Sequence, residues 1–354
     1  MESDGYIIGK NDTILVTGAS GFIGSRVVRS LLNLGFRNLR CFIRPTTPPA
    51  RTGSLLGFHR DGTRVEMLRG NLLSSEDCLA ATRNAAVIIH LAAARGEKSF
   101  PDAYMNSVLT TRNLLAACVQ HRCLRRLVSI SSFAVYTNTQ KPRGRLLDES
   151  CPVEQHPELR GDAYCFAKVK QDEIVAEYGK KYDIPYVIVR PGYVFGPGNE
   201  GITGRVGIGT FGLFLHLGGP NQIPLTYVDN CADAIALASV KKGIDGGVFN
   251  VVDDDLPSSR RFLRLYKKNV KRFKSIYVPH LAAYSLCYLW EKYSAWSKEQ
   301  LPPTFNRKVW HAFWKKTTYS NARLKAGVGW SPRVSMAESL RRYFEACQAR
   351  GRSA

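Results

Sequence analysis

The feature that most constrains the fold of this chain is a glycine-rich turn near its start, TGASGFIG at residues 17–24. Gly18 permits a tight turn, Gly21 lets the backbone approach a pyrophosphate, and Gly24 allows a helix to pack closely on a strand. A helix that begins at such a turn also attracts phosphate, because its first backbone N–H groups and its dipole favour negative charge. The turn therefore predicts a dinucleotide site, provided that a strand precedes it and a helix follows.

Both flanks of the turn meet that condition. Residues 13–17 form a short β-branched apolar run, and residues 22–34 have helical apolar spacing before Gly35, a natural stop for a helix. Similar apolar runs, separated by segments long enough for helices, lie at residues 39–43, 65–68, 87–91, 127–130, 186–189 and 248–252. This alternation predicts an α/β fold, a doubly wound parallel sheet with helices on both faces.

Composition fits a large folded protein. The chain has 354 residues, of which 44% are hydrophobic. It has neither a run of about 18 uncharged apolar residues nor a signal peptide, so a cytoplasmic protein is expected. Nine cysteines are scattered without C-x-x-C spacing. That scatter favours reduced thiols over a disulfide framework or a zinc cluster, and no metal site is expected.

The net charge of +21 is concentrated in the C-terminal third of the chain. Residues 257–316 hold 14 Lys and Arg but two acids, a net +12, together with four of the five tryptophans. Within them, residues 260–273 are amphipathic and basic, residues 276–296 are rich in aromatic side chains with a break at Pro279, and both stretches have a helical pattern.

Three interpretations of this basic, aromatic segment stay open. It is a helical lid whose aromatic side chains form the core of a substrate region, a pair of helices at an anionic membrane surface, or a nucleic-acid contact. Nucleic acid is disfavoured because no nucleic-acid-binding motif accompanies the basic residues.

The second predicted strand bears on the choice of nicotinamide cofactor. An acidic residue at its end would hydrogen-bond the ribose 2′-hydroxyl of NAD, whereas an arginine accommodates the 2′-phosphate of NADP. Here the strand ends Cys-Phe-Ile-Arg at residues 41–44, without an acid. NADP is therefore the expected cofactor, with NAD as the alternative if Arg44 is only a solvated loop charge.

A second motif carries acid–base chemistry. The sequence DAYCFAK at residues 162–168 places Tyr164 and Lys168 one helical turn apart on the same face. A phenol with an ordinary pKa of about 10 is a poor base near neutrality, so a nearby ammonium is needed to favour its ionised form. Lys168 supplies that charge, and the serines at residues 129–132, after a predicted strand, offer a hydroxyl for the substrate oxygen.

Six motifs follow one another in the chain: TGASGFIG, HLAA (90–93), SISSFAVY (129–136), YCFAK (164–168), RPGYVFGPG (190–198) and YVDNCADA (227–234). In this order they resemble the signatures of the extended short-chain dehydrogenase/reductases, the NAD-dependent epimerase/dehydratase family. The resemblance implies a Rossmann sheet with strand order 3-2-1-4-5-6 and a smaller, mostly helical C-terminal substrate domain.

The same resemblance implies a division of the chain. We expect an NAD(P)-binding domain over residues 11–191 and 227–252, a substrate-binding region over 192–226 and 253–345, and flexible termini at 1–10 and 346–354. Many members of the family dimerise through two helices, which here are those around residues 102–120 and 162–182, so a homodimer is a further expectation.

By motif position, the resemblance implies a catalytic triad of Ser132, Tyr164 and Lys168, with Ser131 as the alternative hydroxyl. Tyr164 would move the substrate proton, while Lys168 would hold the nicotinamide ribose and lower the pKa of the tyrosine.

The resemblance also implies the residues that contact the cofactor. Asn71 stands where the family often has an Asp near the adenine, and Asn106 resembles a helix asparagine that supports the site, with a plain helix-surface role equally open. The other expected contacts are Gly18, Ser20, Gly21, Phe22, Ile23, Gly24, Arg44, Leu72, Leu91, Ala92, Ala93, Ser131, Tyr164, Lys168, Pro191, Gly192 and Val194.

Departures from the family pattern bear on the small-molecule substrate. Sugar-nucleotide epimerases typically have an Asn in the segment that matches residues 190–196 and an Arg shortly before the YVD motif. Here Gly192-Tyr193 and the sequence NQIPLT at 221–226 stand in those places. The tail at residues 301–330 looks more like the 3β-hydroxysteroid dehydrogenase-like branch.

Three functions follow from these departures. The expected one is NAD(P)-dependent hydride transfer at a secondary alcohol or ketone of a hydrophobic, 3β-hydroxysteroid-like substrate. A nucleotide-sugar epimerase, dehydratase or reductase is the alternative, because Arg205 and Arg307 could replace the missing phosphate clamp. A non-catalytic NADP-binding regulator or scaffold is the third, and Tyr164 together with Lys168 argues against it.

Overall fold

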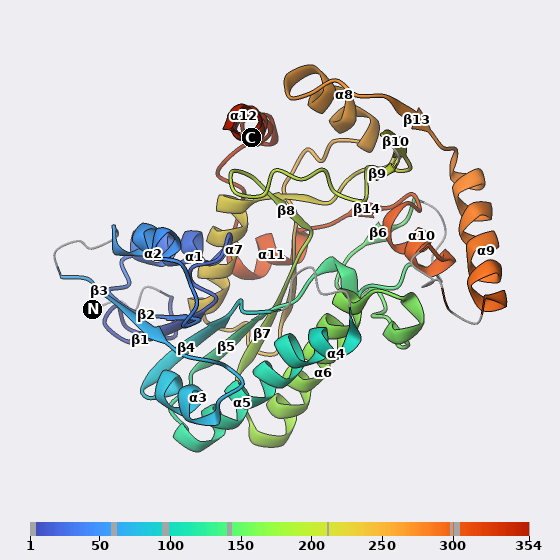
Figure 1. Cartoon of the computed structure of the whole chain (residues 1–354). Helices are drawn as coiled ribbons and strands as arrows, with labels where there is room; N and C mark the ends of the chain where they lie inside the picture. The colour runs from blue at the N-terminus through green and yellow to red at the C-terminus, as the bar shows by residue number, and fades with distance from the viewer. Residues whose placement is uncertain are drawn as a thin grey trace.

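The apolar runs that flank the glycine turn and recur after it form one parallel sheet in the computed structural model of the chain (Figure 1). Its strands are β1 (Thr13–Thr17), β2 (Asn38–Ile43), β3 (Arg64–Arg69), β4 (Ala85–His90), β5 (Arg126–Ile130), β7 (Tyr186–Pro191) and β12 (Val248–Val251). Across the sheet they lie in the order β12-β7-β5-β4-β1-β2-β3. The expected order of six strands is confirmed, and β12 adds a seventh strand beside β7.

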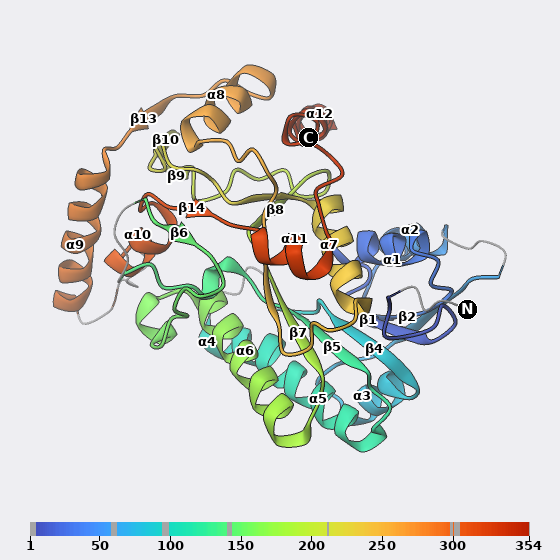
Figure 2. The same cartoon turned by 180° about the vertical axis from the view of Figure 1, so that it is seen from behind.

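Helices cover both faces of this sheet (Figures 1 and 2). One face carries α1 (Gly24–Asn33), α7 (Val228–Val240) and α11 (Ala322–Val328), and the other carries α3 (Ser75–Thr82), α5 (Thr110–His121) and α6 (Ala163–Tyr182). Two hydrophobic cores result, because successive side chains of a strand point to opposite faces. In β1, for example, Ile14 and Val16 belong to the first core and Leu15 to the second.

The structure describes residues 5–57, 62–93, 99–139, 144–210, 212–297, 300 and 305–353. Residues 301–304 of the tail, and residues 1–4 and 354 of the termini expected to be flexible, lie outside this set. Short elements of the first part are α2 (Pro49–Leu56), α4 (Phe100–Ala103) and a π-helical stretch (Tyr104–Leu109) that leads directly into α5.

The described parts of both termini contact the rest of the chain. At the start, the Ile7 backbone N–H donates to the Val240 carbonyl at 2.8 Å, and the Ile8 side chain is buried. At the end, α12 (Met336–Ser353) continues through the residues expected to be mobile. Cys347 on that helix is buried beside Tyr343, so the helix is held by apolar packing.

A second region is built from the segment after β7 and from the chain beyond β12. Its short strands are β8 (Tyr193–Phe195), β9 (Gly207–Thr210), β10 (Leu213–His216), β11 (Leu225–Tyr227) and β13 (Ser275–Tyr277), and β6 (Leu146–Leu147) pairs with β14 (Thr318–Tyr319). Its helices are α8 (Ser259–Asn269), α9 (His280–Trp296) and α10 (Arg307–Phe313), besides α12. The helical character expected of this region is confirmed.

The basic, aromatic segment departs in detail from its expected pattern. The amphipathic helix ends at Asn269 rather than reaching residue 273, and residues 275–277 form β13, which pairs with β10. One edge of β10 pairs with β9. The chain before Pro279 pairs with the other edge as β13. Across the described residues, no helix is both long enough and apolar enough to cross a bilayer.

Candidate active site

The glycine turn lies at the carboxyl end of β1, where the strand order reverses between β1 and β4. Such a reversal opens a crevice at that edge of a parallel sheet. Gly18 has φ +69, and a side chain there would meet the Ala92 backbone nitrogen at 3.0 Å. A side chain at Gly24 would overlap the Gly18 carbonyl oxygen. The turn is therefore folded so tightly that neither position has room for a Cβ, and the start of α1 faces the crevice.

The residues expected near the adenine lie in the turns after β2 and β3. Arg44 directly follows β2, and its side chain is exposed. The Asn71 side chain accepts a hydrogen bond from the Leu73 backbone N–H at 3.0 Å, and the Asn71 N–H donates to the Asp77 carboxylate at 2.7 Å. Asn71 thus shapes its own turn, while Leu72 is buried.

The residues expected beside the nicotinamide half of a cofactor differ in their exposure. Leu91, Ala92 and Ala93 follow β4, and all three are half-buried beside the glycine turn. Asn106 lies in the π-helical stretch, where its side chain is exposed and its amide donates to the Asp102 carbonyl at 3.0 Å. Asn106 therefore sits on a helix surface.

Helix α6 begins at the motif that carries Tyr164 and Lys168. Asp162 caps the helix, because its carboxylate accepts the backbone N–H groups of Tyr164 at 3.1 Å and Cys165 at 3.2 Å. One turn later Lys168 is buried, and its ammonium donates to the Ile130 carbonyl at 2.6 Å and to the Gln171 side chain at 2.8 Å. Tyr164 packs against the apolar cluster that contains Phe133 and Ala134.

The charge of Lys168 is held in a poorly solvated place. Burial lowers the pKa of its ammonium to about 8, and the nearby Asp172 carboxylate opposes that shift. The group therefore still carries its proton at neutral pH, where a positive charge one turn from Tyr164 favours the ionised phenol.

The two candidate serines after β5 differ in burial and in hydrogen-bond partners. Ser131 is buried, and its hydroxyl donates to the Asp172 carboxylate at 2.9 Å. Ser132 is half-buried at the start of a 3₁₀ turn (Phe133–Val135), where its oxygen accepts the Ala134 backbone N–H at 3.1 Å. An oxygen that accepts a hydrogen bond keeps its own hydroxyl proton to donate. Ser131 thus donates its hydroxyl hydrogen within the core, whereas the contact of Ser132 with Ala134 does not use the Ser132 hydroxyl hydrogen.

A chain of hydrogen bonds that sequence reasoning missed joins the glycine turn to Lys168. Thr17 and His90 are 2.8 Å apart, His90 and Thr111 are 2.9 Å apart, and Gln171 donates to Thr111 at 2.9 Å. Gln171 then accepts from Lys168. The signals in the sequence were a histidine at the end of an apolar strand, in the HLAA motif, and a glutamine three residues after Lys168.

The hydrogens in this chain can be placed. The Thr111 hydroxyl lies 2.6 Å from the Ser107 carbonyl and gives it its single hydrogen. His90 Nε2 must then donate to the Thr111 oxygen, so Nδ1 accepts the Thr17 hydroxyl hydrogen. Burial, reinforced by the charge of Lys168, lowers the pKa of His90 to about 3. His90 is therefore a neutral ring in one tautomer, a rigid spacer between β1 and α5.

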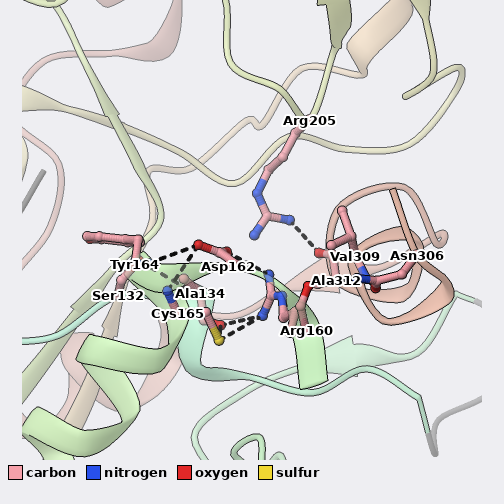
Figure 3. Close-up of polar contacts among 10 residues, drawn as sticks. All are labelled: Ser132, Ala134, Arg160, Asp162, Tyr164, Cys165, Arg205, Asn306, Val309 and Ala312. Atoms are coloured by element: carbon pink, nitrogen blue, oxygen red, sulfur yellow. Dashed lines mark hydrogen bonds and ion pairs between the residues drawn. The ribbon is translucent and has the colours of Figure 1, made fainter. Parts of the chain in front are cut away.

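The arginines considered as a phosphate clamp lie in different places. Arg205 projects toward Asp162 and Arg160 in the view of Figure 3, and it donates to the Ala312 carbonyl at 2.9 Å. The guanidinium groups of Arg205 and Arg160 both lie over the Phe313 ring, 5.0 and 5.4 Å from its centre. Arg307 instead pairs with Glu291 of α9 at 2.8 Å. Arg205 therefore lies with Arg160 around the Phe313 ring, whereas Arg307 pairs with Glu291 of α9.

Two positions at which the chain departs from sugar-nucleotide epimerases have structural roles. A side chain at Gly192 would overlap the Pro224 carbonyl oxygen, because β8 and the strand before α7 approach closely there. Asn221 is buried, and its amide donates to the Trp314 carbonyl. Pro191 is the last residue of β7, and Val194 lies in β8, so these two expected contacts stand on either side of Gly192 in different strands.

Comparison with protein families gives one match over most of the chain. The sequence model of the NAD dependent epimerase/dehydratase family matches residues 14–251. That range begins in β1 and ends with β12, so it contains every strand of the large sheet.

Among curated proteins, relatives fall into more than one activity class. Cinnamoyl-CoA reductase 1 of Oryza sativa is 29% identical over 194 residues, which are 53% of this chain and 55% of that protein. Sterol-4-alpha-carboxylate 3-dehydrogenase (decarboxylating) of Saccharomyces cerevisiae is 26% identical over 69% of this chain and 72% of its own length. A trifunctional UDP-glucose 4,6-dehydratase, epimerase and reductase of Arabidopsis thaliana is 26% identical, and the match spans 37% of it. The chain thus spans about half or less of two of these relatives.

Solved structures share the fold over nearly the whole chain. The structure of gox2253 has a TM-score of 0.76 at 21% identity and covers 97% of this chain and 99% of its own. UDP-glucuronic acid 4-epimerase from Bacillus cereus, solved in complex with NAD, has a TM-score of 0.70 at 23% identity, with 95% and 99% covered.

Proposed function

Because the chain belongs to the NAD-dependent epimerase/dehydratase family, we propose that it is an NAD(P)-dependent oxidoreductase acting at a secondary alcohol or ketone, with Ser132, Tyr164 and Lys168 as its catalytic group. The observation that carries the proposal is the burial of Lys168 on α6, one turn from Tyr164, with its ammonium hydrogen-bonded to Ile130 and Gln171. A buried ammonium is costly unless it is used or compensated.

Each member of the group has a task in the proposed reaction. When bound, the nicotinamide supplies or accepts the hydride. Tyr164 exchanges a proton with the substrate oxygen, and Ser132 donates a hydrogen bond to that oxygen. Lys168 keeps the phenol acidic through its charge and would hold the nicotinamide ribose. The pyrophosphate would lie at the turn of Gly18, Gly21 and Gly24, which leaves room for a close approach.

The central test is the Tyr164→Phe variant, assayed with NADPH and NADH on a panel of steroid-like ketones and UDP- and dTDP-sugars. Turnover is expected to fall about a thousandfold, because the phenol proton is lost while the ring remains. Cofactor affinity, measured by fluorescence titration, should stay within about twofold.

Tyr182→Phe is the matched control, since Tyr182 lies on the same helix but is exposed at its far end. That variant should keep full turnover. Full turnover by Tyr164→Phe would remove the catalytic assignment, and a comparable loss in both variants would reduce it to an effect on α6.

NADP is the proposed cofactor, with Arg44 as the residue that meets its 2′-phosphate. The support is the exposed guanidinium directly after β2 and the lack of an acid in residues 41–44. Arg44→Ala should raise the Kd for NADPH about tenfold, which corresponds to about 1.4 kcal/mol. The Kd for NADH is the internal control and should not change; a preference for NADH that the substitution leaves untouched would contradict the assignment.

A hydrophobic, 3β-hydroxysteroid-like substrate is the proposed class. Support comes from the sterol dehydrogenase among the relatives and from the structural duties of Gly192 and Asn221, which take the places of the usual phosphate contacts. A nucleotide sugar is the second candidate, favoured by the two guanidinium groups of Arg205 and Arg160 that share the Phe313 ring. Turnover of a sugar nucleotide without net cofactor consumption would decide for an epimerase, and an Arg205→Met variant with an unchanged KM would exclude a clamp at that residue.

Two further expectations remain predictions about the assembled protein. The division into a cofactor domain (11–191 and 227–252) and a substrate region (192–226 and 253–345) is supported by the separate apolar core of the latter. The homodimer would use the outer faces of α5 and α6, and light scattering of the purified protein measures it.

A further inference from the structure

Helix α9 carries an unusual outer surface. Of the large hydrophobic side chains that are exposed in the described residues, eight of twelve lie between residues 276 and 296. On α9 itself Leu286, Leu289, Tyr293 and Trp296 recur every three or four residues, and Leu289 and Trp296 are 60% and 78% exposed. Side chains at that spacing share one face of a helix. This surface, with Leu281 at its start, is called the α9 face below.

The opposite side of α9 is well packed, so the helix is held in place. Ala283 and Cys287 are buried with Trp310 and Trp314 of the neighbouring segment. The Tyr284 and Trp310 rings meet edge to face, with centres 5.1 Å apart. The exposure of the α9 face is therefore a property of a fixed amphipathic helix.

A basic stretch precedes the α9 face. Lys268, Lys271, Arg272 and Lys274, at the end of α8 and before β13, are all exposed. The sequence has no Asp or Glu between Asp255 and Glu291. Within the part of the chain that the structure describes, none of the ion pairs includes these four residues. Their charge is thus not neutralised by the protein itself.

The basic stretch and the α9 face lie along one margin of the molecule. Figures 1 and 2 show α8, β13 and α9 following one another along the outer edge, away from the large sheet. An exposed apolar helix surface with basic side chains exposed on the preceding segment combines the two attractions that hold a protein at an anionic membrane surface.

We propose that this edge docks on an anionic lipid membrane. Leucine, tyrosine and tryptophan side chains of the α9 face enter the boundary between headgroups and acyl chains, and the basic stretch meets the lipid phosphates. Docking leaves the protein on one side of the bilayer, because α9 has 17 residues and the described helices include none suited to crossing.

Charge argues against the other occupants of the α9 face. A second copy of this chain would bring two uncompensated basic stretches together, and like charges in an interface oppose association. Nucleic acid would meet the cations and could stack on Tyr293 and Trp296, but it would leave the exposed leucines of the α9 face without an apolar partner. An anionic bilayer satisfies both the apolar and the basic part.

The test is sedimentation of the full chain with vesicles of phosphatidylcholine, with and without phosphatidylserine, in the absence of substrate. We expect pelleting with phosphatidylserine, weakened by salt. The Leu286→Ser/Leu289→Ser/Trp296→Ser variant should lower the partition coefficient about tenfold or more. Met105→Ser/Tyr182→Ser is the control, because both residues are exposed but lie outside the edge. Circular dichroism checks that each variant is folded.

Charge position is tested by a matched pair of double variants. Lys271→Gln/Arg272→Gln should lose about tenfold in binding, whereas Lys180→Gln/Lys181→Gln, which removes the same charge from the end of α6, should not. Equal losses would show a nonspecific effect of net charge and overturn the site. No pelleting with phosphatidylserine at low salt, or a dimer in solution that the triple variant dissociates, would overturn membrane docking. None of these outcomes depends on the proposed enzyme activity.

Discussion

Ser131 and Ser132 are adjacent in the chain but differ in what their hydroxyl groups can still do. The Ser131 hydroxyl is committed to the buried Asp172 carboxylate, whereas the Ser132 oxygen accepts a backbone N–H at the edge of the site. A residue of the same type therefore donates its hydroxyl hydrogen within the core in one case, and in the other it is half-buried and accepts from the backbone.

At the residue scale this difference makes a prediction. Ser132→Ala should lower kcat about a hundredfold, because a donor to the substrate oxygen is lost, while stability changes little. Ser131→Ala should instead lower the free energy of unfolding by about 1–3 kcal/mol, since Asp172 loses a hydrogen bond in a buried place. Steady-state kinetics and urea unfolding of both variants measure the two effects; the opposite pattern would exchange the roles of the serines.

At the scale of elements, α6, β7 and the end of β5 are joined by one buried ion pair. Arg190 of β7 meets Asp172 of α6 at 3.0 Å, and both side chains are 8% exposed. Arg190 also lies over the Tyr136 ring, whose hydroxyl donates to Asn250 of β12 at 2.8 Å. The network joins these strand ends to α6, and it contacts the candidate site through Ser131, which donates to Asp172.

Removing one partner should be costly. Arg190→Met should lower the free energy of unfolding by about 3 kcal/mol, because the Asp172 carboxylate is left buried without its cation. The control is Arg341→Met, which breaks the exposed pairing of Arg341 with Glu338 and should change the free energy of unfolding far less. Urea unfolding measures the change in the free energy of unfolding for each variant. Equal changes would contradict the prediction that the buried ion pair stabilises the fold more than the exposed one.

At the scale of the whole molecule, the chain beyond residue 300 is fastened to the start of α7. The Asn230 side chain both donates to and accepts from the Val334 backbone, at 2.8 and 3.0 Å. Asp253, at the end of β12, accepts from Asn230 at 3.0 Å and from the Tyr227 backbone N–H at 2.9 Å. Burial raises the pKa of the Asp253 carboxyl to about 7. This clamp joins the sheet, α7 and the C-terminal segment.

The clamp predicts a pH dependence. Between the ordinary value of 3.8 and about 7, the folded state holds a proton on Asp253 that the unfolded state has lost. Folding stability contributed by this group is therefore present below that range and is lost as the pH rises through it. The free energy of unfolding of the wild type should fall relative to that of Asp253→Asn, by at most about 1.4 kcal/mol per pH unit. Parallel urea titrations between acid and neutral pH measure the difference, and parallel pH profiles would contradict it.

The sequence by itself determined the features whose cause is local. Spacing within a few residues defined the glycine turn, the strands and the pairing of Tyr164 with Lys168 on one helix, since backbone geometry and side-chain periodicity act over one or two turns. At residues 275–277 the helical spacing of apolar side chains was weak. There the chain pairs with the open edge of β10 and forms a strand.

Only the tertiary structure decided the features that depend on distant segments. It gave Ser131 and Ser132 different hydrogen-bond partners, and it brought His90, Thr111 and Gln171 into one hydrogen-bonded chain. It also sorted the tryptophans of the basic segment, burying Trp310 while leaving Trp296 exposed. The physical reason is that burial and hydrogen-bond partners come from residues far apart in the chain, which no local pattern records.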